Sequence, residues 1–197
     1  MFRAVIEPNL ELRLAHPRIS PDYYSLVKQD RNYLSEWLAW PLHADGEAFF
    51  SEFFKKSLND YANNKAMVCA IFYENELVGN VSFNSISSSL SSVEIGYWLG
   101  FAHQGKGIMS KCVSYLIRYA FTELEMHKVQ ISAATENRPS RALCERLGMS
   151  LEGVITRAEN LNGRVVDHAI YGLSEKNGRI RSRCESSSGR CKLARRA

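Results

Sequence analysis

Two glycines in the segment Gln104-Gly105-Lys106-Gly107-Ile108-Met109 stand where phosphate-binding chemistry would need them. The preceding residues 92–99 alternate as a strand does, and the periodic apolar run from Ile108 to Leu124 predicts a helix. A helix start presents free backbone N–H groups at the positive end of the helix dipole, which favours a pyrophosphate. Glycine lets that backbone approach the phosphates closely. The same pattern also fits an ordinary strand-to-helix turn.

Three stretches in order along the chain resemble one family. The glycine segment resembles the acyl-CoA loop of the GNAT acetyltransferases, and residues 137–149 resemble their Asn-x-x-Ser helix. The hairpin at residues 157–163 is similar to that of RimL-type ribosomal-protein N-terminal acetyltransferases. The chain is thereby identified, over about residues 8–174, as a member of the RimL-like branch of the GNAT superfamily. Met109 departs from the family's glycine or alanine, but the backbone amide is retained.

The resemblance implies a fold and a cosubstrate. The expected fold is α/β, with a mixed central sheet of about seven strands, splayed at the centre and flanked by about four helices. Acetyl-CoA would place its pantetheine arm between the strands that end near Leu99 and Thr135, without a metal. The implied cofactor-binding residues are Trp98, Leu99, Gln104, Gly105, Lys106, Gly107, Ile108, Met109, Asn137 and Ser140. Asn137 fits a helix cap nearly as well.

Acetyl transfer to an amine needs a neutral amine, and this requirement directs attention to two glutamates. An α-amino group with a pKa of about 8 is neutral in about a tenth of molecules at pH 7, so a carboxylate that removes a proton is useful. Glu94 matches the strand glutamate that many GNAT enzymes use. Glu159 matches the hairpin glutamate of the RimL type, which faces the acceptor amine. We favour Glu159 over Glu94, and the alternative for both is a solvated or salt-bridged carboxylate.

The leaving thiolate needs little help, because its conjugate thiol has a pKa of about 8.5. Many GNAT enzymes place a tyrosine where this chain has Cys144. Ser140 aligns with the serine that the RimL type keeps near the sulfur, so the resemblance implies a hydrogen bond from Ser140. A serine that satisfies backbone groups in the first helical turn is the alternative. A Cys/His nucleophile is not favoured, because the pairs available lack a third orienting residue. His168, in an alternating strand, is interpreted as structural.

The acceptor side is less specific. Trp37 and Trp40 lie in a stretch that flanks the acceptor in GNAT enzymes, so they are candidate walls beside Glu159, although core packing also explains them. The resemblance implies acetylation of an α-amino group, with the N-terminus of a ribosomal protein as the favoured acceptor and a homodimer as the assembly. The alternatives are a small-molecule N-acetyltransferase for a polyamine or antibiotic, and a non-catalytic acyl-CoA-binding or RNA-associated module.

Further elements must position these residues. Apolar periodicity and proline or glycine boundaries predict helices near residues 20–28, 31–39, 45–61 and 138–147. Asp45 is expected to cap the third of these helices. Strands are predicted at residues 10–14, 67–73, 77–83, 127–135, 150–160 and 164–173. The Asn162-Gly163 pair predicts a tight hairpin between the last two strands.

Composition limits the class of protein. The chain has 197 residues and a net charge of +4, but residues 175–197 carry eight Lys/Arg against two Asp/Glu. Residues 1–174 therefore carry −2, unlike a nucleic-acid-binding domain, and are expected to form a single domain. The basic tail 175–197 is predicted to be disordered and is interpreted as dispensable or vector-derived.

The remaining composition argues for a cytoplasmic protein without a metal. The sequence has no apolar run that could span a membrane and no secretory leader, so we expect a cytoplasmic location. Its five cysteines have no metal-ligand spacing. Those in apolar patterns, Cys69, Cys112 and Cys144, are predicted to be buried free thiols.

Overall fold

The computed structural model describes residues 2–175, which form eight strands and five α-helices. The strands are β1 (Arg3–Glu7), β2 (Leu10–Leu14), β3 (Met67–Tyr73), β4 (Glu76–Ser87), β5 (Ser92–Leu99), β6 (Lys128–Ala134), β7 (Ser150–Leu161) and β8 (Arg164–Ser174). The helices are α1 (Ser20–Gln29), α2 (Arg31–Ser35), α3 (Glu47–Ala62), α4 (Ile108–Thr122) and α5 (Arg138–Arg146). All strands join one mixed sheet in the order β1-β2-β3-β4-β5-β6-β8-β7. The expected α/β architecture is confirmed, with one strand and one helix more than the resemblance implied.

The additional strand is β1, which the sequence did not reveal. It pairs antiparallel with β2 at the edge of the sheet, and a register shift falls between Val5 and Glu7. Only Ala4 of this strand is buried. Because only one apolar side chain is buried, β1 lacks the alternation of apolar and polar residues that predicts a strand. It is recognised as a strand by its pairing with β2.

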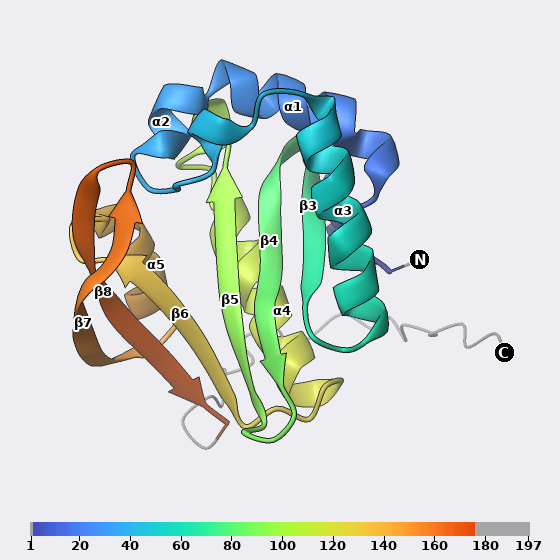
Figure 1. The fold of residues 1–197 in the computed structure, drawn as a ribbon. Coiled ribbons are helices and arrows are strands. Elements are labelled where there is room, and N and C mark those ends of the chain that lie inside the picture. The colour runs from blue at the N-terminus through green and yellow to red at the C-terminus, as the bar shows by residue number, and fades with distance from the viewer. Residues whose placement is uncertain (1, 176–197) are drawn as a thin grey trace, which may run out of the picture.

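Helices cover both faces of the sheet (Figure 1). Successive residues of β3 pack into two different hydrophobic cores, one on each face of the sheet. Cys69 packs with the cluster that holds α4 and α5, and Ala70 packs with the cluster that holds α1 and α3. This is the period of two that places successive side chains on opposite faces of a strand. β3 is therefore buried on both sides and anchors the sheet.

The sheet opens between β5 and β6. These parallel strands pair only through Ser92–Glu94 and Lys128–Gln130, although β5 continues to Leu99 and β6 to Ala134. Figure 1 shows the two strands diverging towards the end of the molecule where α1 and α2 lie. The predicted splay is confirmed, and it leaves the β6-facing backbone of residues 95–99 without a neighbouring strand.

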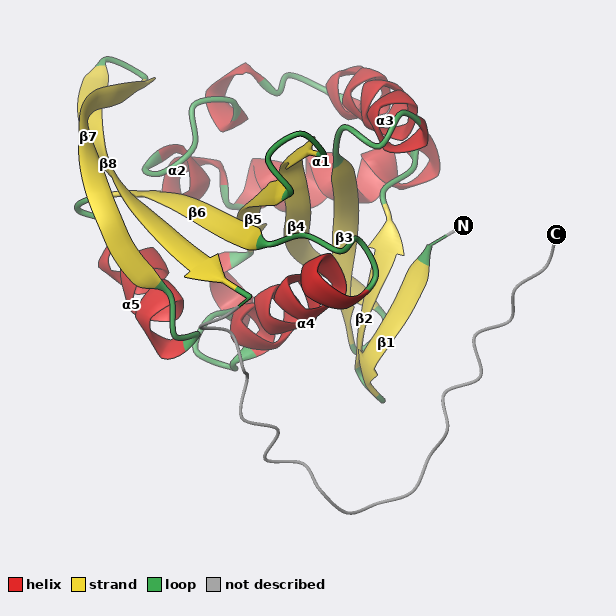
Figure 2. Cartoon of the chain, turned by 90° about the horizontal axis from the view of Figure 1, so that it is seen from below, coloured by secondary structure: helices red, strands yellow, loops and turns green. Residues whose placement is uncertain are grey.

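The closing hairpin forms as the sequence predicts. Asn162 and Gly163 connect β7 to β8 with φ angles of +53° and +99°, which suits a tight hairpin turn. Figure 2 shows β7 as the outermost strand beyond β8. β8 pairs with β6, so the hairpin adjoins the β6 side of the opening in the sheet.

Three further expectations concern the cysteines, membrane-spanning helices and the basic tail. Cys69, Cys112 and Cys144 are buried free thiols, as predicted. Among the described residues, no helix is both long and apolar enough to cross a membrane. The basic tail lies outside the described residues, except for Glu175, whose carboxylate oxygen lies 2.9 Å from the Nδ1 atom of His127.

Candidate active site

A cavity of about 1150 Å³ occupies the opening between β5 and β6. The start of α4, the start of α5, the aromatic side chains of α2 and α3 and the closing hairpin all contribute to its walls. Predicted site residues that line it are Trp37, Trp40, Glu94, Trp98, Leu99, Gln104, Gly105, Gly107, Ile108, Met109, Asn137, Ser140 and Glu159. Lys106 is the exception, because its ammonium group lies over the ring of Tyr73, 5.8 Å from the centroid. A volume of this size accommodates a large ligand.

The glycine loop has the geometry of an anion cradle. Gly105 and Gly107 have φ angles of +72° and +74°, and a Cβ atom built on either would meet nothing within 4 Å. Helix α4 begins directly afterwards at Ile108 and runs for 15 residues. The loop is tied to α2 by a hydrogen bond from the Gln104 amide to the Tyr33 hydroxyl. Open space beside two glycines at a helix start suits a pyrophosphate, so these residues fit acyl-CoA.

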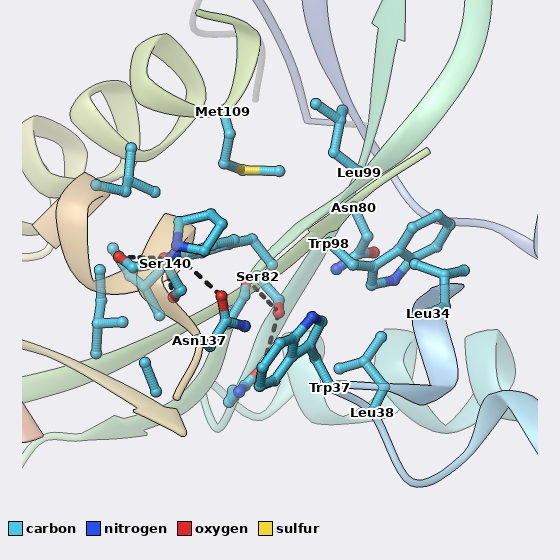
Figure 3. Close-up of a pocket in the computed structure, with 18 of the residues that line it drawn as sticks. Leu34, Trp37, Leu38, Asn80, Ser82, Trp98, Leu99, Met109, Asn137 and Ser140 are labelled. Atoms are coloured by element: carbon cyan, nitrogen blue, oxygen red, sulfur yellow. Dashed lines mark hydrogen bonds between the residues drawn. The ribbon is translucent and has the colours of Figure 1, made fainter. Parts of the chain in front are cut away.

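Asn137 and Ser140 begin helix α5 at the cavity wall. The Asn137 Oδ1 atom accepts a hydrogen bond from the Ser140 backbone N–H at 3.1 Å, so Asn137 is the helix N-cap. The capping interaction uses only the amide oxygen and leaves the Nδ2 group available to the cavity (Figure 3). Both interpretations of Asn137 from the sequence are therefore compatible. Figure 3 shows Met109 and Ser140 towards one side of the cavity and Trp37 and Leu38 towards the other.

Sequence reasoning missed the partner of Ser140. The Tyr97 hydroxyl lies 2.7 Å from the Ser140 Oγ atom. Burial raises the pKa of Tyr97, and the neighbouring Cys144 raises it further, so the phenol keeps its proton. Alternation along β5 places Tyr97 on the same face as Ile95, but it does not indicate which residue 43 positions away the hydroxyl contacts. Tyr97 can donate to Ser140 and leave the serine proton free for a group in the cavity.

The two candidate bases have different partners. The Glu159 carboxylate lies 3.1 Å from the Nε2 atom of His168, and both side chains line the cavity. The Glu94 carboxylate accepts a hydrogen bond of 2.9 Å from the Ser132 hydroxyl. His168 is thus next to the predicted base, a contact that its alternating strand context did not show. The sequence signal was present only as two titratable residues on adjoining strands of one hairpin.

A β-bulge lies next to Glu159. The register between β7 and β8 shifts between Ile155, which pairs with His168, and Glu159, which pairs with Val166. Arg157 within this bulge has a φ angle of +52°, and its backbone N–H donates to the Asp167 Oδ1 atom at 2.8 Å. Bulges occur near active sites. The bulge places Ile155 opposite His168, whereas Glu159 keeps the register that the hairpin turn sets.

Aromatic side chains form the wall opposite the coenzyme loop. The Trp40 ring packs against Trp98, with 6.0 Å between centroids, and against Phe49, with 6.4 Å. The Arg164 guanidinium lies over the Trp37 ring at 5.2 Å and donates to the Glu136 carboxylate at 2.9 Å. Arg164 thereby fixes the hairpin tip next to Trp37. The tryptophans thus have packing roles and also line the cavity.

Cys144 is not arranged as a nucleophile. Its side chain is fully buried, and burial raises the pKa of its thiol to about 11. The reactive thiolate is therefore scarce at neutral pH. Among residues 2–175 there is no group of three or more His, Cys, Asp or Glu side chains that could hold a metal ion.

A sheet splayed at its centre, a glycine loop at a helix start and a carboxylate facing the resulting cavity define the class of protein. Residues 9–150 match the acetyltransferase (GNAT) domain model, so the chain belongs to the GNAT acetyltransferase family. It is an N-acetyltransferase that takes its acetyl group from acetyl-CoA.

Its relatives place it in the RimL-like branch. The ribosomal-protein-serine acetyltransferase of Escherichia coli (strain K12) is 31% identical over 167 residues, which are 84% of this chain and 93% of that protein. RimL, a ribosomal L7/L12 α-N-protein acetyltransferase solved with coenzyme A, has a TM-score of 0.85 and 28% identity over 88% of this chain and 98% of that one. The microcin C7 self-immunity acetyltransferase MccE, solved with acetyl-CoA and AMP, has a TM-score of 0.82 and 30% identity over 86% of this chain and 94% of that one.

Proposed function

We propose that the protein acetylates the α-amino group of a protein N-terminus, and that the acceptor is a ribosomal protein. The observation that carries the proposal is the Glu159–His168 pair, which lines the same cavity as the aromatic rings of Trp37 and Trp40. We refer to these rings as the acceptor wall. This wall suits the first side chains of a peptide, because tryptophan rings provide apolar contact area. The similarity to acetyltransferases that are named for ribosomal-protein serine and for L7/L12 supports the same acceptor class.

The charges around the cavity favour a peptide over a polyamine. Only two glutamates, Glu94 and Glu159, line the cavity among the described residues, and each has a hydrogen-bond partner. A polyamine carries several positive charges, and a site that holds it would need several carboxylates to compensate for their lost solvation. A single α-ammonium group needs one carboxylate, which Glu159 provides.

The proposed mechanism is a direct attack with two assisting side chains. Acetyl-CoA supplies the activated acetyl thioester, which the amides of residues 104–109 and the side chain of Asn137 would hold. Glu159 takes a proton from the acceptor ammonium at its carboxylate oxygen and frees the nitrogen lone pair. The nitrogen attacks the thioester carbon and the carbon–sulfur bond breaks, while the Ser140 hydroxyl, oriented by Tyr97, keeps its proton and donates a hydrogen bond to the departing sulfur. The second proton that the nitrogen loses passes to the thiolate. Glu94 keeps Ser132 in place and is the alternative base.

A mixed acceptor panel tests this proposal. Intact-mass spectrometry would follow ribosomal-protein N-terminal peptides, lysine peptides, polyamines and aminoglycosides incubated with acetyl-CoA and the protein. We expect one acetyl group on peptide α-amines and a loss of roughly a hundredfold or more in turnover for Glu159→Gln. Glu94→Gln is the matched control and should retain most of the activity.

Two results would contradict the proposal. Acetylation of polyamines or aminoglycosides in place of peptides would transfer the assignment to a small-molecule N-acetyltransferase. Acetyl-CoA binding without any product would favour the non-catalytic module. Full activity in Glu159→Gln with a strong loss in Glu94→Gln would make Glu94 the base and leave the acceptor assignment standing.

We also propose the extent, location and assembly of the protein. The acetyltransferase domain would cover residues 1–174, because β8 runs to Ser174 and completes the sheet beyond the family match. A ribosomal acceptor places the reaction in the cytoplasm. The outer strand β7 is exposed along residues 150–158, including the large apolar side chains of Leu151, Val154 and Ile155. An exposed apolar edge strand is a pairing surface, and it supports a homodimer formed through β7.

A further inference from the structure

His168 is the residue next to the proposed base that the mechanism above leaves without a role. It lies on β8, pairs with Ala134 on β6 and with Ile155 on β7, and its side chain is 20% exposed. Its Nε2 atom lies 3.1 Å from Glu159 Oε2, and its ring lines the same cavity. Within the described part of the chain, His168 is the hydrogen-bond partner found for the Glu159 carboxylate.

The pair is built by the fold rather than by chance proximity on a flexible surface. In the register set by the hairpin turn, Leu161 pairs with Arg164 and Glu159 pairs with Val166, which lies two residues from His168 on the same face of β8. The contact between Glu159 and His168 is therefore a diagonal one across β7 and β8. The bulge at residues 156–158, anchored by Asp167, places Ile155 opposite His168.

Other charged groups near His168 have partners of their own. Glu94 on β5 faces Ser132 on β6, and Asp167 on β8 bonds the Arg157 backbone. At the far end of β6 and β7, the Lys128 ammonium and the Glu152 carboxylate lie 2.6 Å apart. At the hairpin tip, Arg164 pairs with Glu136. Glu159 is the one of these groups within hydrogen-bond distance of the imidazole ring.

We infer that His168 is a positioning residue that acts through Glu159: its Nε2 atom takes over the proton that the carboxylate removes, and the imidazolium then donates this N–H to the carboxylate. The inference rests on the proposed role of Glu159. The ammonium N–H bond breaks, its electron pair stays on nitrogen, and the proton moves to Glu159. The neutral imidazole, protonated on Nδ1, then accepts this proton at Nε2. The imidazolium finally returns the proton to water, and the carboxylate is free for the next turnover.

Imidazole suits this second position because it is a stronger base than a carboxylate. A proton shared between an imidazole and a carboxylate therefore favours the imidazole nitrogen. An imidazole that already holds both of its protons cannot accept a further one. Acid should therefore reduce the activity that depends on His168.

The test is the pH dependence of kcat/KM, measured from pH 5 to 9 on the full chain with whichever acceptor amine the panel identifies. We expect the wild-type protein to lose activity on an acidic limb that His168→Gln lacks. At pH 7 the kcat of His168→Gln should be lower by roughly tenfold, less than the loss from removing the base. The KM for acetyl-CoA should be unchanged. The ionisation of the acceptor amine is common to all variants and cancels in the comparison.

A matched control and two opposing outcomes complete the design. Ile170→Val changes a side chain on the same face of β8 and should leave the pH profile unchanged. Wild-type kcat and an unaltered acidic limb in His168→Gln, together with a strong loss in Glu159→Gln, would overturn the role of His168 alone. Full activity in Glu159→Gln would instead overturn the proposed base, and with it the reason for His168 to act through that residue.

Discussion

At the scale of single residues, Gly107 combines a left-handed backbone with open space towards the cavity. Its φ angle is +74°, and no atom lies within 4 Å of a Cβ built on it. Gly107→Val should weaken acetyl-CoA binding roughly tenfold or more, because a branched side chain is strained in this conformation by roughly 1–2 kcal/mol and would occupy the space in front of the loop amides. Isothermal titration calorimetry with acetyl-CoA measures this change directly.

Gly148 provides the matched control for this prediction. It ends the α5 region with a φ angle of +77° and also has nothing within 4 Å of a built Cβ, but it does not line the cavity. Gly148→Val should carry a similar strain, seen as a lower unfolding temperature, and keep its affinity for acetyl-CoA. If the two variants bind acetyl-CoA with equal affinity, the glycine loop is not part of the coenzyme site.

Structural features set by residues close together in the sequence were predictable, and contacts between residues far apart in the sequence were not. The spacing of Asn137 and Ser140 indicated a helix start, and the structure has that cap. The contact of Ser140 with Tyr97 joins residues 43 positions apart and depends on how β5 and α5 pack. The contact of Glu159 with His168 is a diagonal one across β7 and β8. Neither the packing of β5 with α5 nor a diagonal contact leaves a periodic signal in the sequence.

At the scale of elements, helix and strand types were predictable, but their ends depended on tertiary contacts. The predicted helix over residues 31–39 ends at Ser35, and the next residues leave the helix so that Trp37 and Leu38 line the cavity. The expected cap Asp45 is wrong, because Gly46 is the N-cap of α3 and Asp45 instead lies 3.8 Å from the Arg31 guanidinium.

The bulge in β7 leads to a prediction at the scale of elements. Asp167→Ala removes the acceptor of the Arg157 backbone N–H, which is 2.8 Å away. An exposed hydrogen bond of this kind contributes about 0.5–1.5 kcal/mol, so Glu159 should spend less time in place and kcat should fall by roughly twofold to tenfold. The KM for acetyl-CoA should not change, because the coenzyme loop is on another element. Steady-state kinetics with the peptide acceptor separates the two parameters.

Asp167→Asn is the control for the bulge, because its side-chain oxygen can still accept the Arg157 N–H. It should behave like the wild-type protein. A wild-type kcat in Asp167→Ala would mean that the backbone of residues 155–159 holds its shape without this bond. Equal losses in both variants would point to the charge of Asp167 as the cause.

At the scale of the whole molecule, the two edges of the sheet differ. β1 is short, has five residues and carries Arg3, whose side chain pairs with Glu11 on β2. β7 has 12 residues, and Leu151, Val154 and Ile155 are each at least half exposed. Figure 2 shows it as the outermost strand of the sheet, beyond β8. A long edge with apolar side chains on its surface invites pairing, whereas a short charged edge resists it.

The last prediction follows from this difference. If β7 pairs with a second copy, the wild-type protein should have about twice the monomer mass of 22.4 kDa in size-exclusion chromatography with light scattering. Ile155→Lys should give the monomer mass, because an unpaired ammonium group would be buried at the centre of the strand contact. Leu90→Lys is the control, since Leu90 is an apolar side chain exposed in the turn between β4 and β5. A monomeric wild type, or a dimer that both lysine variants retain, would exclude β7 as the interface.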